Sequence, residues 1–274
     1  MKSALHLSIA MCSCATALAQ APSVQITSDV RETYAQAYGF DWEYDDGTEV
    51  AHVGPNSAAE WIDVDGVTLT DWWSIEVGAA SFYSESHLGT ARIDGLFDCS
   101  ASTAGNHFQE DASSRASFDV DFTVPALGVR YAFDGEADSS YGYNTANVRL
   151  RHVESGSNVL VVTGDHGGSD SLQDRVGWLP AGTYELRSEG EAMAYGNHDY
   201  TETQSAHVEF ELRLYEPGDL DLDGSVTYAD MLAYKNAWKS GSATADVDGN
   251  GTVDLSDSHA FELAWRAGFG AQSN

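Results

Sequence analysis

Residues 206–214 read A-H-V-E-F-E-L-R-L, and this stretch decides the fold class. Apolar side chains occupy every second position, and polar or charged side chains fill the positions between them. A period of two places one face against a core and the other in water, as in a half-buried antiparallel strand. The same alternation runs through residues 116–124, with shorter copies at 129–133, 148–150 and 184–186. The repeated pattern predicts strands for this part of the chain.

Turn-forming residues separate these alternating segments. Clusters of Gly, Asp, Asn and Ser occur at residues 134–135, 156–158 and 167–170. Residues 179–186 read as a turn that feeds a strand, because Pro180 fixes φ and Gly182 permits a tight return. Many short strands without a helical period before residue 228 predict a mainly β fold, an antiparallel β-sandwich that is jelly-roll-like. The order of these strands resembles that of secreted bacterial β-sandwich proteins.

The composition excludes some classes of partner. The 274 residues include 43 acidic and 13 basic side chains, for a formal net charge of −30. Nucleic acids and anionic membranes require clustered Lys and Arg, so we expect neither as a partner. The chain is 42% hydrophobic and 11% aromatic, which is enough for a packed core.

The first nineteen residues have the features of a signal peptide. Lys2 supplies a positive charge, residues 5–18 are mostly apolar, and residues 17–19 read A-L-A, as a cleavage site requires. The sequence therefore predicts secretion to the cell surface or beyond. A lipid-anchored form would use Cys12 or Cys14, but neither follows the small-residue pattern of lipidation sites. No later window reaches eighteen apolar residues, so no membrane span is expected.

Cleavage at this site would leave Cys99 as the one remaining cysteine. An intrachain disulfide is then impossible. We interpret Cys99 as a small hydrophobic residue packed in the sandwich, in preference to a reactive thiol.

The C-terminal part contains a duplicated loop pattern. Residues 219–230 read D-L-D-L-D-G-S-V-T-Y-A-D, and residues 246–257 read D-V-D-G-N-G-T-V-D-L-S-D. Each is a twelve-residue loop of the EF-hand type, with oxygen donors at positions 1, 3, 5, 7 and 12 and Gly at position 6 for the sharp turn. The pattern predicts two calcium ions. The predicted ligands are Asp219, Asp221, Asp223, Ser225 and Asp230 in the first loop, and Asp246, Asp248, Asn250, Thr252 and Asp257 in the second.

The duplication extends beyond the loops. Residues 219–238 align with residues 246–265 without a gap, and eight positions are identical. Shared Ala, aromatic and Trp positions follow each loop at helical spacing. Tyr234 of the first copy aligns with Phe261 of the second. We therefore expect two loop–helix halves that pack around a pseudo-twofold axis.

This duplicated loop–helix pattern resembles a type I dockerin domain, over about 55 of the 274 residues. The resemblance implies a small all-α module with two calcium ions, which docks onto cohesin domains, often on polysaccharide-degrading assemblies. Two features depart from the family. Only fifteen residues, 231–245, separate the loops, and positions 10 and 11 are Tyr228-Ala229 and Leu255-Ser256 in place of Ser-Thr-like pairs. A calmodulin-like sensor fits poorly, because position 12 is Asp and no helix precedes the first loop.

The large module offers weaker signals. Residues 63–66 read D-V-D-G, which we interpret as a β-turn in preference to part of a calcium loop. His166 and His198 lie in polar segments and are expected to be exposed loop residues rather than metal ligands. Residues 139–143 contain two tyrosines, either for ligand contact or to cap the sandwich. The tryptophans that either stack on sugar rings or pack in the core are Trp42, Trp61, Trp72, Trp73 and Trp178.

The predicted organisation is a signal peptide (1–19), a β-sandwich (20–216) and a dockerin-like module (217–274). We expect a secreted calcium-binding protein whose tail docks a ligand-binding sandwich onto a cohesin-like or cell-surface partner. The alternative is a carbohydrate-active module that binds glycan or hydrolyses polysaccharide. A structural protein of the envelope or matrix is a third possibility. No catalytic motif such as G-x-S-x-G or H-E-x-x-H occurs, so the sequence favours a non-enzymatic role, and the catalytic residues of any hydrolase stay unknown.

Overall fold

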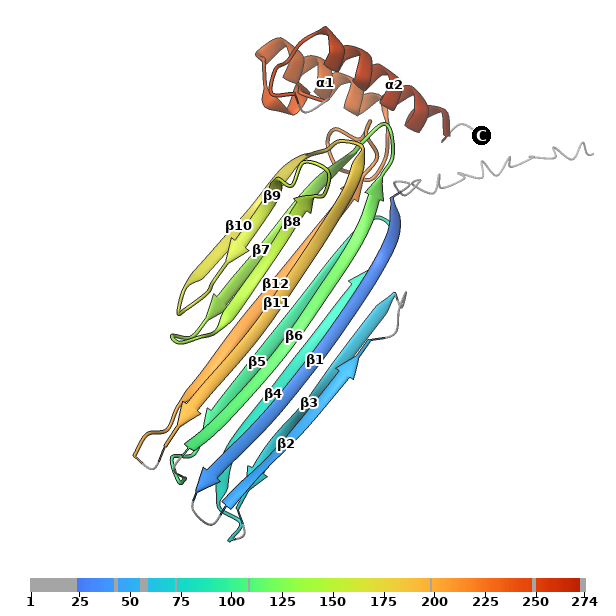
Figure 1. Cartoon of the computed structure of the whole chain (residues 1–274). Helices are drawn as coiled ribbons and strands as arrows, with labels where there is room; N and C mark the ends of the chain where they lie inside the picture. Colours follow the sequence, from blue (N-terminus) through green and yellow to red (C-terminus); the bar gives the residue numbers. More distant parts are fainter. Residues whose placement is uncertain are drawn as a thin grey trace, which may run out of the picture.

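The protein consists of a long β-sandwich with a small helical module at one end (Figure 1). A computed structural model describes residues 24–41, 44–54, 59–71, 73–107, 109–197, 199–247 and 250–271. The predicted signal peptide, Trp42, Trp72, His198 and Asp248 lie outside these residues.

Twelve strands form two six-stranded antiparallel sheets. The strand order in the first sheet is β2-β1-β6-β11-β8-β9. Its strands are β1 (Gln25–Asp41), β2 (Tyr44–Val53), β6 (Gln109–Val124), β8 (Thr145–His152), β9 (Asn158–Thr163) and β11 (Gly182–Gly196). The strand order in the second sheet is β10-β7-β12-β5-β4-β3. Its strands are β3 (Glu60–Thr70), β4 (Glu76–Leu88), β5 (Arg92–Thr103), β7 (Val129–Ser139), β10 (Ser169–Leu179) and β12 (Thr203–Tyr215).

The chain crosses repeatedly between the two sheets. After β5, every connection except the one from β8 to β9 leads to the opposite sheet. When the second order is read in reverse, strands at matching places also contact each other face to face, as β5 with β6, β11 with β12 and β7 with β8. This wrapping confirms the jelly-roll-like antiparallel sandwich predicted from the sequence.

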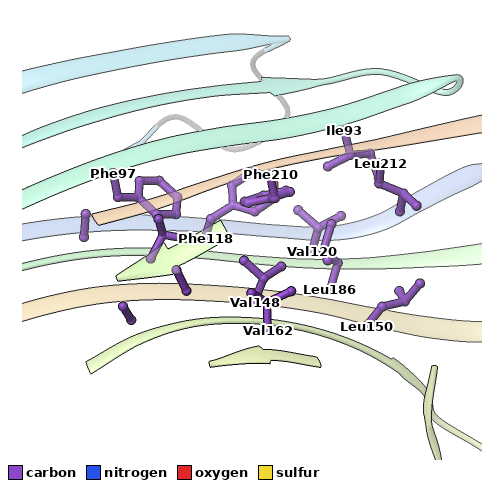
Figure 2. Packing of buried hydrophobic residues seen from close by; sticks show 14 of the residues in the cluster. Ile93, Phe97, Phe118, Val120, Val148, Leu150, Val162, Leu186, Phe210 and Leu212 are labelled. Carbon is purple, nitrogen blue, oxygen red and sulfur yellow. The ribbon is translucent and has the colours of Figure 1, made fainter. Parts of the chain in front are cut away.

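The core lies between the sheets and follows the alternation of the sequence. In β12, Ala206, Val208, Phe210, Leu212 and Leu214 are buried, and the residues between them face outward. Figure 2 shows Phe118 and Phe210 from opposite sheets side by side, with ring centroids 5.8 Å apart. Full burial of a Phe side chain contributes roughly 1.5–3 kcal/mol. The strand faces that the sequence predicts to be apolar are therefore the ones buried in the core.

Residues 63–66 are not a turn, as the sequence had suggested, but part of β3. β3 pairs with β4, and Gly66 lies so close to that strand that a Cβ there would be 2.8 Å from the carbonyl oxygen of Ala80. Gly66 thus serves strand packing rather than chain reversal. The Asp63 carboxylate accepts a hydrogen bond from Thr33 and lies 2.9 Å from Nδ1 of His52.

Cys99 is buried in the core, as predicted. Its side chain donates a hydrogen bond to the carbonyl oxygen of Gly190 at 3.2 Å, and burial raises the pKa of the thiol to about 12. Burial thus disfavours the thiolate near neutral pH, as for a cysteine packed in a core. Among the described residues, no helix is long and apolar enough to cross a membrane.

The C-terminal module contains α1 (Tyr228–Ser240), a short 3-10 helix at Ala243–Ala245, and α2 (Leu255–Ala271). Each α-helix begins within the last three positions of a predicted calcium loop, so the loop–helix halves are present as expected. α1 begins with a capping box between Thr227 and Asp230 and ends at Gly241, whose φ of 64° is left-handed.

Candidate calcium sites and docking face

The first loop is closed by hydrogen bonds from its own backbone. The Asp219 carboxylate accepts from the N–H of Asp223 at 3.2 Å and from that of Gly224 at 2.9 Å. Oδ1 of Asp223 accepts from the N–H of Ser225 at 2.8 Å. The side chains at positions 1 and 5 are thereby turned into the loop, which is where a bound cation needs them.

The second loop repeats this pattern at the equivalent positions. Asp246 accepts from the N–H of Asn250 at 3.1 Å and from that of Gly251 at 2.8 Å. Oδ1 of Asn250 accepts from the N–H of Thr252 at 2.8 Å. The two loops therefore share one backbone geometry in the residues that the structure describes, as their alignment predicts.

Position 12 has a structural role that the sequence did not reveal. Asp230 accepts from the N–H groups of Leu220 and Asp221 with one oxygen, and from that of Thr227 with the other. Asp257 accepts in the same way from Val247 and Asp254, at 2.7 and 2.8 Å. Both carboxylates are fully buried. Each one ties the start of its loop to the start of its helix.

Position 6 requires glycine because of its backbone conformation. Gly224 has a φ of 88° and Gly251 a φ of 83°. A Cβ at either position would meet no atom within 4 Å, so the requirement is conformational rather than steric crowding.

The first loop gathers carboxylates that suit a hard cation. Oxygen atoms of Asp219, Asp221 and Asp223 lie within 4.8 Å of one another. Burial raises the pKa of Asp219 to about 7, and the carboxylates of Asp230 and Asp223 add to the rise. Burial and the same two neighbours also raise the pKa of Asp221. A divalent cation would remove this repulsion, and calcium prefers such oxygen donors.

The two halves meet at an aromatic pair that occupies equivalent positions in the two repeats. The rings of Tyr234 and Phe261 stack with centroids 4.0 Å apart and an angle of 4° between their planes. Trp265 completes the contact, because its Nε1 donates to the carbonyl oxygen of Thr227 at 2.7 Å. The core of the module is thus shared between the halves.

The outward surfaces of the helices expose apolar and basic side chains. Positions 10 of the two loops, Tyr228 and Leu255, are 61% and 80% exposed. A groove of about 330 Å³ lies between α1 and α2. Trp238 and Trp265 line it, and so do all three basic residues of the module, Lys235, Lys239 and Arg266. In a chain of net charge −30, this is a local concentration of positive charge.

Most of the candidate binding residues in the large module are exposed at the surface, and the others are partly buried. His166 is exposed, and its Nδ1 lies 2.7 Å from the carbonyl oxygen of Gly142. Tyr141 and Tyr143 are 84% and 71% exposed, so they do not cap the sandwich core. Trp73 is 70% exposed, and Trp61 is half-buried.

Trp178 packs against the core of the C-terminal module, and Arg130 of the neighbouring strand contacts the same module. Arg130 is 6% exposed, and its Nη2 donates to the carbonyl oxygen of Thr244 at 3.2 Å. No sequence pattern predicts this contact, because nothing relates a single Arg in β7 to a distant loop.

Residues 217–260 match the family model of the dockerin type I domain. The C-terminal module is type I dockerin-like. Dockerin domains bind calcium and cohesins. The helical part of this chain lies where the family match lies.

Other comparisons add no functional information. Comparison with curated proteins gives no significant match. Tailspike protein 4 of bacteriophage CBA120 is 14% identical over 56% of this chain and 18% of its own, with a TM-score of 0.21. The VP2 subviral particle of infectious bursal disease virus is 8% identical over 69% of this chain and 56% of its own, with a TM-score of 0.20. The chain thus spans less than two thirds of either protein.

Proposed function

We propose that the protein is a secreted, calcium-dependent adaptor. Its dockerin-like module binds a cohesin-type partner and thereby attaches the sandwich, a ligand-binding module, to a larger assembly or to a cell surface. Two calcium ions hold the module, one in each loop, through the ligands predicted from the sequence.

The duplicated loop geometry is the observation that supports this function best. Positions 1, 5 and 12 make the same backbone hydrogen bonds in both loops, and the halves share the Tyr234–Phe261 stack. Such a module has two equivalent outward faces, since each loop leads into a helix with an exposed position 10. Family recognition depends on these positions, and here they present Tyr228 and Leu255.

The side chains on these faces suggest the chemistry of the partner. Tyr228, Leu232 and Leu255 are exposed apolar side chains, and the groove between the helices has a basic rim. A partner that complements them has an apolar patch bordered by acidic side chains. This preference differs from that of modules with Ser-Thr pairs at positions 10 and 11.

A binding experiment with the full chain tests the proposal. The immobilised chain is exposed to a panel of cohesin domains, with calcium and then with a chelator. We expect retention of at least one cohesin in calcium and none in chelator. Leu255→Asp and Tyr228→Asp together should abolish retention, whereas Tyr141→Asp, an equally exposed change on the sandwich, should not. Retention that persists in chelator would contradict the proposal.

A second candidate function is glycan binding by the sandwich. A groove of about 530 Å³ crosses the outer face of the first sheet, and polar side chains line most of it. Arg115 lies there at 2.7 Å from Glu189, and Arg187 lies 3.6 Å from Asp119. Such planar polar groups can hydrogen-bond adjacent sugar hydroxyls in pairs. The exposed ring of Tyr143, which meets Tyr195 edge to face, offers a stacking surface outside the groove.

Affinity electrophoresis in gels that contain soluble polysaccharides tests this candidate. Retardation of the full chain that is lost in Arg187→Ala, but kept in the matched Arg213→Ala on the other sheet, supports glycan binding in the groove. Equal mobility in every gel contradicts it. Reducing-sugar release from the same polysaccharides would indicate the hydrolase form of this function.

A further inference from the structure

The outer face of the second sheet carries a histidine that lies between carboxylates. His207 of β12 is half-buried, and Asp98 of β5 is its partner in the strand register. Nδ1 of the imidazole lies 2.7 Å from Oδ1 of Asp98, and Nε2 lies 3.4 Å from Oε1 of Glu136 on β7. The group therefore spans three neighbouring strands, β5, β12 and β7.

A further carboxylate lies at the same place. Glu209 follows His207 by two residues in β12, so both side chains point to the same face of the sheet. In the register of β12 and β7, Glu209 is directly opposite Glu136. Ligand atoms of His207, Glu136 and Glu209 all lie within 4.8 Å of one another. Like charges directly opposite each other destabilise a strand pair, so the two glutamates favour a cation between them.

Arginine does not supply that cation, although it does so elsewhere on this face. Glu211, the next outward residue of β12, has Nε of Arg92 at 2.9 Å and also pairs with Arg213. Among the residues that the structure describes, no Lys or Arg forms an ion pair with Glu136 or Glu209. These two carboxylates therefore lack the compensation that Glu211 has.

The spacing of the ring nitrogen and the carboxylate fits a tetrahedral metal ion. Hydrogen bonds of this kind are roughly 2.7–3.2 Å long, and the distance of 3.4 Å between Nε2 of His207 and Oε1 of Glu136 exceeds that range. Two ligand atoms that each lie about 2.1 Å from a tetrahedral zinc ion are about 3.4 Å apart. A metal-binding histidine almost always has a carboxylate or another acceptor at its second ring nitrogen, and Asp98 occupies that place.

We propose that His207, Glu136 and Glu209 form a zinc site on the sandwich, with Asp98 holding the imidazole in position. A cavity of about 250 Å³ is lined by both glutamates, and a water molecule or an external ligand can reach the fourth position of the metal from there. The imidazole distinguishes this site from the two loops, because calcium prefers six to eight oxygen donors. A bound zinc ion would link β12 to β7 and stabilise the sandwich. The site is independent of the docking module.

Calorimetric titration of the full chain with zinc chloride tests the proposal, in an excess of calcium that fills the loops. We expect one zinc ion per chain, lost in His207→Gln and in Glu209→Gln. Asp98→Asn should keep the site and weaken zinc binding by about 10–100-fold, as for other partners of a metal-bound histidine. His87→Gln is the matched control and should bind zinc normally, because His87 lies on the same sheet with a single carboxylate, Glu60, at 3.9 Å.

Thermal melting of the strand signal separates loss of the site from loss of the fold. Without zinc, His207→Gln and Glu209→Gln should melt as the unmodified chain does, because both side chains lie outside the core. Zinc should raise the melting temperature of the unmodified chain and of His87→Gln, but not that of His207→Gln. Absence of zinc binding to the unmodified chain would overturn the proposal. Zinc binding that is unchanged in His207→Gln, or lost equally in His87→Gln, would overturn it as well.

Discussion

Tyr234 and Phe261 show how single residues hold the C-terminal module together. They occupy the same position in the two repeats, and their rings stack 4.0 Å apart. Phe261 is 1% exposed and Tyr234 is 5% exposed. Neither helix can bury its ring alone, so each ring is covered by the ring of the other half. The alignment of the repeats predicts that the halves pack around a pseudo-twofold axis, and these two equivalent residues lie where the halves meet.

Replacement of one ring should separate the halves. Tyr234→Ala is expected to destabilise the calcium-loaded module by roughly 3–5 kcal/mol, as for other large-to-small changes of buried aromatic residues. Tyr234→Phe places in the first half the residue that the second half already has, and should cost less than about 1.5 kcal/mol. Denaturant unfolding followed by helical circular dichroism measures both. An equal effect of the two changes would contradict the stacking argument.

Asp219 should give the calcium-free module an unusual dependence on pH. Its folded-state pKa of about 7 lies above the ordinary value of 3.8, so the folded module holds a proton that the unfolded chain releases. Between about pH 4 and pH 7, stability therefore falls as the pH rises. In chelator, the melting temperature of the helices should decrease across this range. Asp219→Asn should show a shallower decrease, and a rise with pH would contradict the assignment.

At the scale of elements, each loop and its helix form one hydrogen-bonded unit. The position-12 aspartate of each half accepts N–H groups from the beginning and from the end of its loop. In the first half the same residue is part of the capping box of α1. Loop closure and helix initiation are therefore coupled through one buried carboxylate.

Asp230→Asn should disrupt this unit at nearly constant size. An amide nitrogen in place of one oxygen cannot accept the bonds that Leu220, Asp221 or Thr227 donates, and an unsatisfied buried group costs about 1–3 kcal/mol. We expect a loss of stability of that size and of one bound calcium. Glu262→Gln removes one exposed charge from the same module and should change neither. Calorimetric unfolding and calcium titration check both quantities, and normal calcium binding by Asp230→Asn would contradict the prediction.

The strands show how far sequence alone leads. In β12 the alternation fixes both the strand and its buried face, because one face has only apolar side chains. The turn predicted at residues 63–66 is wrong, since Gly66 permits the close approach of β4 rather than a chain reversal. Strand partners are also absent from the pattern: nothing in residues 206–214 indicates that β12 lies between β5 and β7. Pairing depends on the whole chain, whereas alternation is local.

At the scale of the whole molecule, two modules with different sources of stability share one chain. The sandwich buries a large apolar core, whereas the helical module has a small core and clustered carboxylates. The sequence predicts both modules but not the contact between them. Arg130 and Trp178 belong to strands, and their contact with the module follows from tertiary structure alone.

Calcium removal should therefore affect the two modules differently. In chelator, the helical signal should melt at a lower temperature, because the loop carboxylates lose the cation that neutralises their mutual repulsion. The strand signal should melt as it does in calcium, since the core of the sandwich contains no predicted ligand. Circular dichroism at helix and strand wavelengths follows the two transitions. A single transition that shifts as a whole would mean that the sandwich depends on calcium too.

The number of calcium ions bound by the full chain tests the central claim most directly. Native mass spectrometry in calcium should show two ions on the unmodified chain, one on Asp219→Ala or Asp246→Ala, and none on the double variant. This result would establish that each repeat holds one ion. A chain that binds no calcium, or that keeps both ions in the double variant, would contradict the account.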